Sequence, residues 1–157
     1  MLVRLYDLPD ASYALQRVTR GGATIRRPDP QDKSRLLEWV ATQFTQRWVA
    51  ECEIAFGSTP PSCFVACSQS GIVGFACHDC TRLNFFGPMG VTEQERRQGI
   101  GVALLLSCLH SMRDAGYAYA IIGGVGPADF YAKTVGATLI EGSTPGIYRQ
   151  VAGTITI

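Results

Sequence analysis

The segment Arg96-Arg97-Gln98-Gly99-Ile100-Gly101 joins an apolar, strand-like run to an amphipathic helix, and it decides the fold. Glycine has no Cβ atom, so Gly99 and Gly101 let the backbone approach a ligand closely. The unpaired N–H groups and the positive dipole end of the following helix favour negative charge, and the two arginines add cations beside them. The junction is therefore typical of a phosphate-binding site.

A helix follows this loop. Its apolar residues recur three and four positions apart, which places one continuous stripe against a core. They are Val102, Leu105, Leu106, Leu109 and Met112. Arg113 in the last turn and Gly116 just beyond it are a common helix end, so the pattern predicts a helix with defined limits.

The run before the loop, residues 83–91, is β-prone but contains Pro88 and two glycines. Proline has no N–H to donate to a sheet. We therefore expect this strand to bulge or to part from a neighbour, which leaves backbone groups free to bind a ligand.

Two common phosphate loops do not fit. The loop of nucleoside triphosphatases needs a lysine and a serine or threonine after its last glycine, whereas this chain continues with Val102 and Ala103. A dinucleotide-binding fold needs a third glycine at the proper offset and an acidic residue at the end of the next strand, and neither is found as far as Val125. A tight strand-to-helix turn without a ligand is the plain alternative.

The spacing Val91-x-x-x-x-Arg96-Arg97-x-Gly99-Ile100-Gly101 resembles the acyl-CoA pyrophosphate loop of the GCN5-related N-acetyltransferase (GNAT) superfamily. Glu93 stands where a proline is common in the family, and Arg97 where a glycine is common. The resemblance implies an α/β (α+β) fold with a mixed, centrally splayed β-sheet flanked by helices. Residues 1–22 would be a short N-terminal extension and residues 23–157 the acetyltransferase domain.

Local patterns fit the order of elements that this resemblance implies. Asp29-Pro30-Gln31-Asp32 predicts the start of a helix, and a second helix ends at Gly57. We expect strands at 23–27, 63–67, 72–77, 83–91 and 117–125, a short helix at 127–135, and closing strands at 138–140 and 147–151. Ahead of this core, residues 2–5 could form a strand and residues 11–20 a short helix or loop.

The resemblance also implies residue roles. The loop residues Arg96, Arg97, Gln98, Gly99, Ile100 and Gly101 would hold the CoA pyrophosphate, and Met89, Gly90 and Val91 would bind the pantetheine and the acyl carbonyl. Tyr131 matches the tyrosine that contacts the cofactor and protonates the departing thiolate. It stands in a segment like the family's Phe-Tyr-x-x-x-Gly, with one extra residue before Gly136. A packing role for Tyr131 is the alternative.

No motif marks the base that would deprotonate an attacking amine, which is mostly ammonium at neutral pH. Asp79, beside His78 near a strand end, and Glu51, on the second helix, are our leading candidates. His78, Glu53, Glu141 and a chain of ordered waters are alternatives, and a charged helix residue is more often simply solvated.

Two further segments would lie near the substrates. Residues 142–148 are predicted as a loop and strand in which Ser143, Thr144 and Tyr148 could touch an acceptor, although such a segment is often only a turn. The glycines of residues 123–126 would open a slot for pantetheine or, alternatively, allow close packing of a strand and helix.

Composition predicts one domain. The chain has 157 residues, of which 46% are hydrophobic and 17% charged, and no apolar run approaches the roughly 20 residues of a membrane span. The first seven residues lack the layout of a secretion signal, so we expect a cytoplasmic protein. A net charge of +1 argues against nucleic acid as a partner, and nothing indicates a membrane partner. A homodimer stays open.

The six cysteines raise the question of a metal site, because residues 77–80 form a C-x-x-C motif. If residues 72–80 form a strand, Cys77 and Cys80 face opposite sides of the sheet. Cys63 and Cys67 share a face but would lie about 13 Å apart along it. We therefore expect no metal and no disulfide, with the cysteines serving as small buried hydrophobes.

Taken with the family, these features predict an N-acetyltransferase that moves an acetyl group from acetyl-CoA to a primary amine of a small molecule or peptide by direct attack. The alternative is a non-catalytic acyl-CoA-binding sensor or regulatory module.

Overall fold

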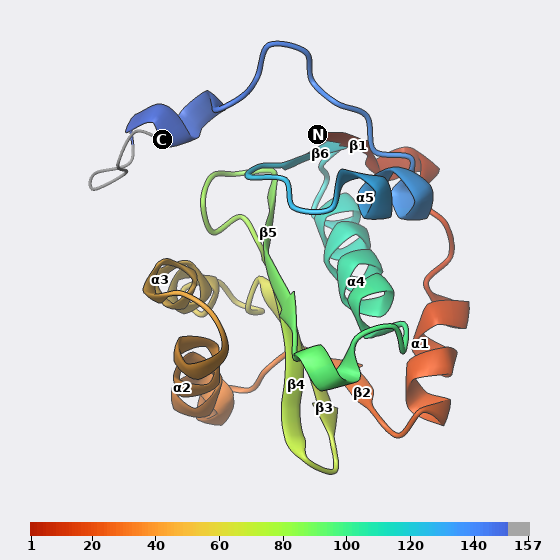
Figure 1. Cartoon of the computed structure of the whole chain (residues 1–157), viewed down its shortest axis with the longest axis vertical. Coiled ribbons are helices and arrows are strands. Elements are labelled where there is room, and N and C mark those ends of the chain that lie inside the picture. Colours follow the sequence, from red (N-terminus) through yellow and green to blue (C-terminus); the bar gives the residue numbers. More distant parts are fainter. Residues whose placement is uncertain (151–157) are drawn as a thin grey trace.

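The computed structural model describes residues 1–150, which form one sheet with helices on both faces (Figure 1). The six strands have the order β1-β6-β5-β4-β3-β2, and β5 and β6 are its parallel pair. The strands are β1 (Leu2–Arg4), β2 (Thr24–Arg26), β3 (Cys63–Ser68), β4 (Gly71–His78), β5 (Phe85–Val91) and β6 (Tyr119–Ile122). The expected α/β architecture with a mixed sheet is confirmed.

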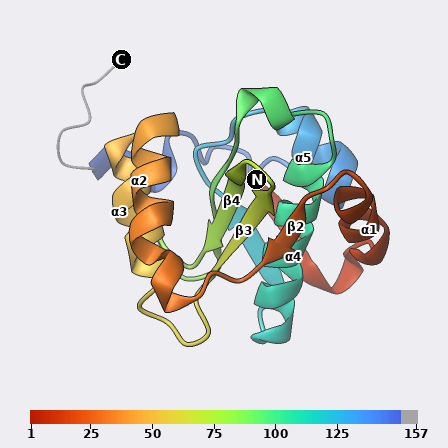
Figure 2. The same ribbon diagram turned by 90° about the horizontal axis from the view of Figure 1, so that it is seen from below.

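Helices cover both faces of the sheet. Those on one face are α2 (Lys33–Gln43) and α3 (Gln46–Ala55), and those on the other are α1 (Ser12–Arg20), α4 (Ile100–Asp114) and α5 (Ala128–Val135) (Figures 1 and 2). Short 3-10 turns lie at η1 (Leu5–Asp7), η2 (Pro30–Asp32), η3 (Glu93–Glu95) and η4 (Gly146–Gln150). Each face of the sheet therefore has its own hydrophobic core.

The helix predicted after the loop is α4, and it begins at Ile100 because Gly99 caps it in a left-handed conformation, with φ at +90°. Leu105, Leu109 and Met112 are fully buried, as the apolar stripe predicts. At the start of α2, Asp29 and Asp32 form the reciprocal hydrogen bonds of a capping box. Both predicted helix starts are confirmed.

The sheet parts between β5 and β6. Their register holds only two pairs, Phe85 with Ile121 and Phe86 with Ile122. On its other side β5 stays paired with β4 as far as Val91. The edge of β5 from Gly87 onward thus faces a gap instead of a strand, as expected for a strand that contains Pro88.

The two predicted closing strands do not form. Thr138 makes one isolated bridge to Leu2, and Gly146–Gln150 is the 3-10 helix η4, while residue 151 lies outside the described residues. The outer edge of β6 is taken instead by β1, through pairs such as Val3 with Ala120. Because β1 occupies this edge, the chain after α5 meets only the far edge of β1, at the single bridge between Thr138 and Leu2.

The first residues of the chain are part of this fold. Val3 and Leu5 are fully buried, and Ala14 and Val18 of α1 pack into the same core as α4. The N-terminal amine donates a hydrogen bond of 2.7 Å to the carbonyl of Ile122. The segment therefore completes the sheet edge beside the gap. Within residues 1–150, no helix combines the length and the apolar character needed to span a membrane.

Candidate functional site

A cavity of about 830 Å³ opens where β5 and β6 part. Its walls come from α3, β5, the loop after β6, α5 and the C-terminal segment, and they include Glu51, residues 85–89, residues 123–127, Tyr131 and Tyr148. This volume is in the range of pockets that hold small-molecule ligands. The cavity is therefore the candidate active site.

The open edge of β5 presents backbone donors. Thr92 N–H donates to Val73 of β4 at 2.9 Å, and strand geometry alternates the direction of successive N–H groups. In the regular pairing of residues 89–91 with β4, Gly90 N–H therefore faces β4, and the N–H groups of Met89 and Val91 face the gap. A Cβ on Gly90 would collide with the Phe44 ring, so this glycine also serves packing on the opposite face.

At the end of β5 the predicted loop forms a candidate anion site. The first bond of α4 runs from Ala103 N–H to the Gly99 carbonyl at 3.0 Å, so the N–H groups of residues 100–102 precede it and have no partner inside the helix. Such N–H groups, at the positive end of the helix dipole, bind phosphate. Arg97 has a φ of +67°, and Arg96 Nε donates to the Val91 carbonyl at 3.4 Å.

Arg96 and Arg97 are exposed, and neither forms an ion pair with any described residue. Arg17 is a third cation at this loop, and the sequence did not predict it. A Cβ on Gly99 would lie 3.3 Å from Arg17 Cδ, so the Arg17 side chain of α1 passes over the loop. This contact depends on the packing of α1 against α4, which no local pattern reveals.

Tyr131 lies on α5 and its side chain is buried against the cavity. Its ring packs edge-to-face on Phe86 and Phe130, with centroids 6.2 and 5.1 Å away. Burial raises the pKa of Tyr131. No side chain among residues 1–149 hydrogen-bonds its hydroxyl, which leaves that proton available to a ligand in the cavity.

Glu51 lies on the opposite wall. Its carboxylate accepts a hydrogen bond of 2.8 Å from Thr81 Oγ1 and lies 3.7 Å from Arg47 Nε, with 14% of the side chain exposed. Glu53 lies two residues further along α3 and therefore on a different side of the helix. Its carboxylate pairs with Lys33 Nζ at 3.1 Å, and it does not line the cavity. Glu51 is thus the carboxylate from α3 that the fold brings to the gap.

Asp79, the other candidate base, does not line the cavity. One carboxylate oxygen accepts from Asn84 N–H at 2.7 Å and the other lies 2.8 Å from His78 Nδ1. Because a carboxylate only accepts, we infer that His78 Nδ1–H donates to Asp79. The other nitrogen of a neutral ring, Nε2, then accepts from the Ser111 hydroxyl 3.0 Å away, whose oxygen also accepts from Arg27 at 2.6 Å. Desolvation lowers the pKa of His78, which fits a neutral ring.

The C-terminal segment closes one side of the cavity. It crosses from α5 toward α3 beyond the end of the sheet (Figure 1), and Ser143, Thr144 and Tyr148 contribute to the cavity wall. Tyr148 fills the space beside Gly123, where a Cβ would collide with its hydroxyl, and Arg47 lies 4.9 Å from its ring centroid. The glycines after β6 therefore make room for an aromatic side chain of the chain itself.

The anion site and the cavity share one strand. Phe86 in the cavity and Val91 before the loop are five residues apart, which spans about 17 Å in a β-strand. The N–H groups of Met89 and Val91 lie along that path. A ligand that uses both sites must be elongated, anionic at one end and polar along the strand.

Comparison with known proteins gives a family match. The model of the acetyltransferase (GNAT) family matches residues 33–136, from the start of α2 to the end of α5. The matched range includes the parted strands, the loop and Tyr131. No curated protein sequence matches the chain.

Solved structures with the same fold have low sequence identity. One is the GCN5-related glucosamine N-acetyltransferase region of a fungal multi-domain GH3 β-N-acetylglucosaminidase, with a TM-score of 0.68 and 14% identity over 85% of this chain and 19% of that one. A GCN5-related N-acetyltransferase from Sphaerobacter thermophilus gives 0.65 and 20% over 85% of this chain and 45% of that one. The chain thus spans less than half the length of either.

A third similar structure, a GNAT family acetyltransferase from Brucella melitensis, was solved in complex with acetyl-CoA. Its TM-score is 0.56, with 18% identity over 71% of this chain and 80% of that one. These likenesses show the fold.

Proposed function

Because the chain belongs to the GNAT acetyltransferase family, we propose that it transfers an acetyl group from acetyl-CoA to a primary amine of a small molecule or peptide by direct attack. The observation that carries this proposal is the alignment of an anion site, an open strand edge with free N–H groups, and a cavity along β5. Acetyl-CoA is an elongated molecule with a pyrophosphate near one end and a thioester at the other, and it matches this order.

The residues present fit the donor. The N–H groups of Ile100, Gly101 and Val102 would hold the pyrophosphate, with Arg17, Arg96 and Arg97 supplying positive charge around it. A side chain at Gly99 would press on Arg17 and would be strained at the positive φ. The Met89 and Val91 N–H groups would bind the amide groups of the pantetheine arm and the acyl carbonyl.

When bound, acetyl-CoA supplies an activated carbonyl and a thiolate leaving group. An N–H on the open edge of β5 would stabilise the negative charge that develops on the carbonyl oxygen as the amine attacks. Tyr131 would donate its phenolic proton to the departing sulfur, and the raised pKa of Tyr131 keeps that proton on the hydroxyl at neutral pH.

Glu51 is the residue that we propose as the base. It lines the cavity, and its second carboxylate oxygen has no hydrogen bond with a described residue. It would accept the proton that the attacking ammonium must lose, directly or through water. Asp79, whose two oxygens are both engaged, would instead hold the turn after β4.

Release of free CoA thiol with a panel of amines tests the proposal. The panel includes peptides, aminoglycosides and glucosamine, each incubated with acetyl-CoA and the full chain. We expect at least one amine to release CoA faster than hydrolysis alone. Binding of acetyl-CoA with no release across the panel would instead support a non-catalytic acyl-CoA sensor.

A further inference from the structure

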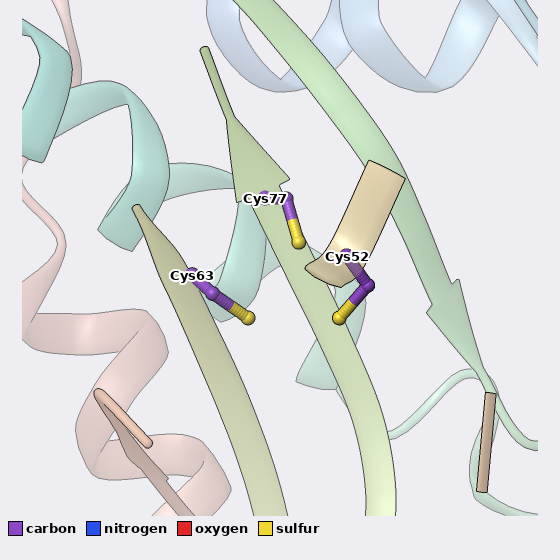
Figure 3. A group of neighbouring side chains, drawn as sticks. All are labelled: Cys52, Cys63 and Cys77. Carbon is purple, nitrogen blue, oxygen red and sulfur yellow. The ribbon is translucent and has the colours of Figure 1, made fainter. Parts of the chain in front are cut away.

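Three cysteines outside the proposed active site meet between α3 and the sheet (Figure 3). Cys52 comes from α3, Cys63 begins β3, and Cys77 lies directly opposite Cys63 on β4. Their sulfur atoms all lie within 4.8 Å of one another, and each residue is fully buried. Sequence reasoning compared cysteines within one strand or motif, whereas this trio joins three elements.

We propose that Cys52, Cys63 and Cys77 form a binding site for a soft, thiophilic metal ion, with Cu(I) in three-coordinate sulfur geometry as the ion that fits best. Soft thiolate ligands favour Cu(I) and zinc over hard cations. The site lies in the core between the sheet and helices α2 and α3, and the proposal does not depend on the proposed transferase activity.

The sulfur positions suit a trigonal ion. Metal–thiolate bonds of about 2.3 Å, the length seen with zinc, put the three sulfurs of a planar site about 4.0 Å apart. The widest pair in the structure, at up to 4.8 Å, would need to close by about 0.8 Å. In Figure 3 the Sγ atoms of Cys63 and Cys77 point toward the side on which Cys52 lies.

Zinc fits less well because its structural sites are almost always four-coordinate. Cys80, the fourth cysteine near the trio, contacts Cys77 but donates its thiol to the His78 carbonyl at 3.2 Å. His78 is occupied by Asp79 and Ser111. The remaining wall is apolar and includes Leu36, Val40 and Phe75, which offer a fourth ligand neither directly nor through water.

A bound ion would tie α3 to β3 and β4, because the three cysteines come from these elements. Helix α3 carries Glu51 in the position next to Cys52.

Anaerobic titration of the reduced full chain with Cu(I), in competition with a colorimetric Cu(I) chelator, tests the site. We expect one Cu(I) per chain, an ultraviolet thiolate-to-copper absorption, and a higher thermal midpoint. Cys52→Ala should weaken Cu(I) binding by more than about 100-fold, because it removes a direct ligand. Loss of a residue that only hydrogen-bonds a metal ligand already lowers metal affinity by about 10- to 100-fold. Cys67→Ala, which removes the half-buried cysteine of β3 outside the trio, should bind like the wild type.

Absence of chelator-resistant Cu(I) in the wild type would overturn the proposal, as would equal binding by both variants. Selective retention of Zn²⁺ over Cu(I) would overturn the copper assignment. Copper X-ray absorption on the loaded wild type needs no variant and therefore does not depend on how Cys52→Ala folds. It should report three sulfur neighbours, and a shell with nitrogen or oxygen ligands would contradict the site.

Discussion

The side chain of Arg17 lies across Gly99, the residue that caps α4, so the N-terminal helix supplies a cation to the loop that begins that helix. Arg17 belongs to α1, and Gly99 follows the parted strand β5. The contact brings positive charge to unpaired N–H groups at the positive end of a helix dipole.

Arg17→Gln should weaken CoA binding and make it less sensitive to salt. An exposed cation near phosphate is worth about 1 kcal/mol, or roughly a fivefold change in dissociation constant. Titration calorimetry at two salt concentrations measures both effects. Arg113→Gln, at the other end of α4, is the matched control and should change neither. Equal affinity of wild type and Arg17→Gln would remove Arg17 from the site.

Gly99→Ala should destabilise the fold. At a φ of +90° a Cβ is strained by about 1–2 kcal/mol, and here it would also press on Arg17. Urea denaturation measures the loss. Gly101→Ala is the control, because this residue lies inside α4, where alanine favours helix, and the added Cβ would lie 3.9 Å from Phe130 Cζ, an ordinary contact distance. A loss for Gly101→Ala as large as for Gly99→Ala would contradict the role of the conformation.

Tyr131→Phe should lower turnover by roughly 100-fold while leaving CoA affinity nearly unchanged, because the hydroxyl is needed for proton donation and the ring for packing. Burial raises the pKa of Tyr131, so the deficit should persist across neutral and mildly alkaline pH. Steady-state rates together with direct CoA titration separate the two effects. Tyr13→Phe, at an exposed site on α1, is the control. Unchanged turnover would assign Tyr131 to packing alone.

Glu51→Gln and Asp79→Asn each remove one carboxylate, and they should differ in effect. Glu51→Gln should reduce kcat/KM by roughly 100-fold or more, because the proposed base is lost. Asp79→Asn should instead lower stability, since it disturbs the bonds to His78 and Asn84. Rate profiles and urea denaturation of both variants make the comparison. The reverse pattern would make Asp79 the base.

His78 should make stability fall in mild acid. Desolvation lowers the pKa of His78 in the folded chain, so the unfolded chain binds a proton first as the pH drops below about 6.5. The contribution of neutral His78 to stability is present in full above about pH 6.5, the pKa of an unfolded histidine. It is lost progressively as the pH falls from there to the lower pKa of His78 in the folded chain. Denaturation curves across the range should show the decline in the wild type and a weaker one in His78→Gln. An equal decline in both would assign it to other groups.

Local chemistry predicted the parts of this fold that depend on neighbours in the chain. Gly99 and the stripe along α4 determine where that helix starts and which side is buried, and Pro88 predicts the parting of β5. The site along β5 follows from those two elements. The family resemblance supplied the order of the remaining elements.

Contacts between distant segments could not be predicted in the same way. Pairing of Val3 with Ala120 fills the edge of β6, so residues 138–140 reach only β1, through the single bridge between Thr138 and Leu2. The approach of Arg17 to Gly99 and the meeting of Cys52 with Cys63 likewise depend on how helices pack on the sheet. Strand β4 also ends at His78, whereas residues 72–80 were predicted as one strand. Cys80 therefore lies outside the strand, and the alternation of side chains along β4 does not decide which way it points.

A crystal structure of the chain with acetyl-CoA would show where the donor lies along β5. We expect the pyrophosphate on the N–H groups of Ile100, Gly101 and Val102, the pantetheine beside Met89 and Val91, and the thioester between Tyr131 and Glu51. Acetyl-CoA bound away from the gap between β5 and β6, or with its pyrophosphate off the α4 N-terminus, would contradict the account.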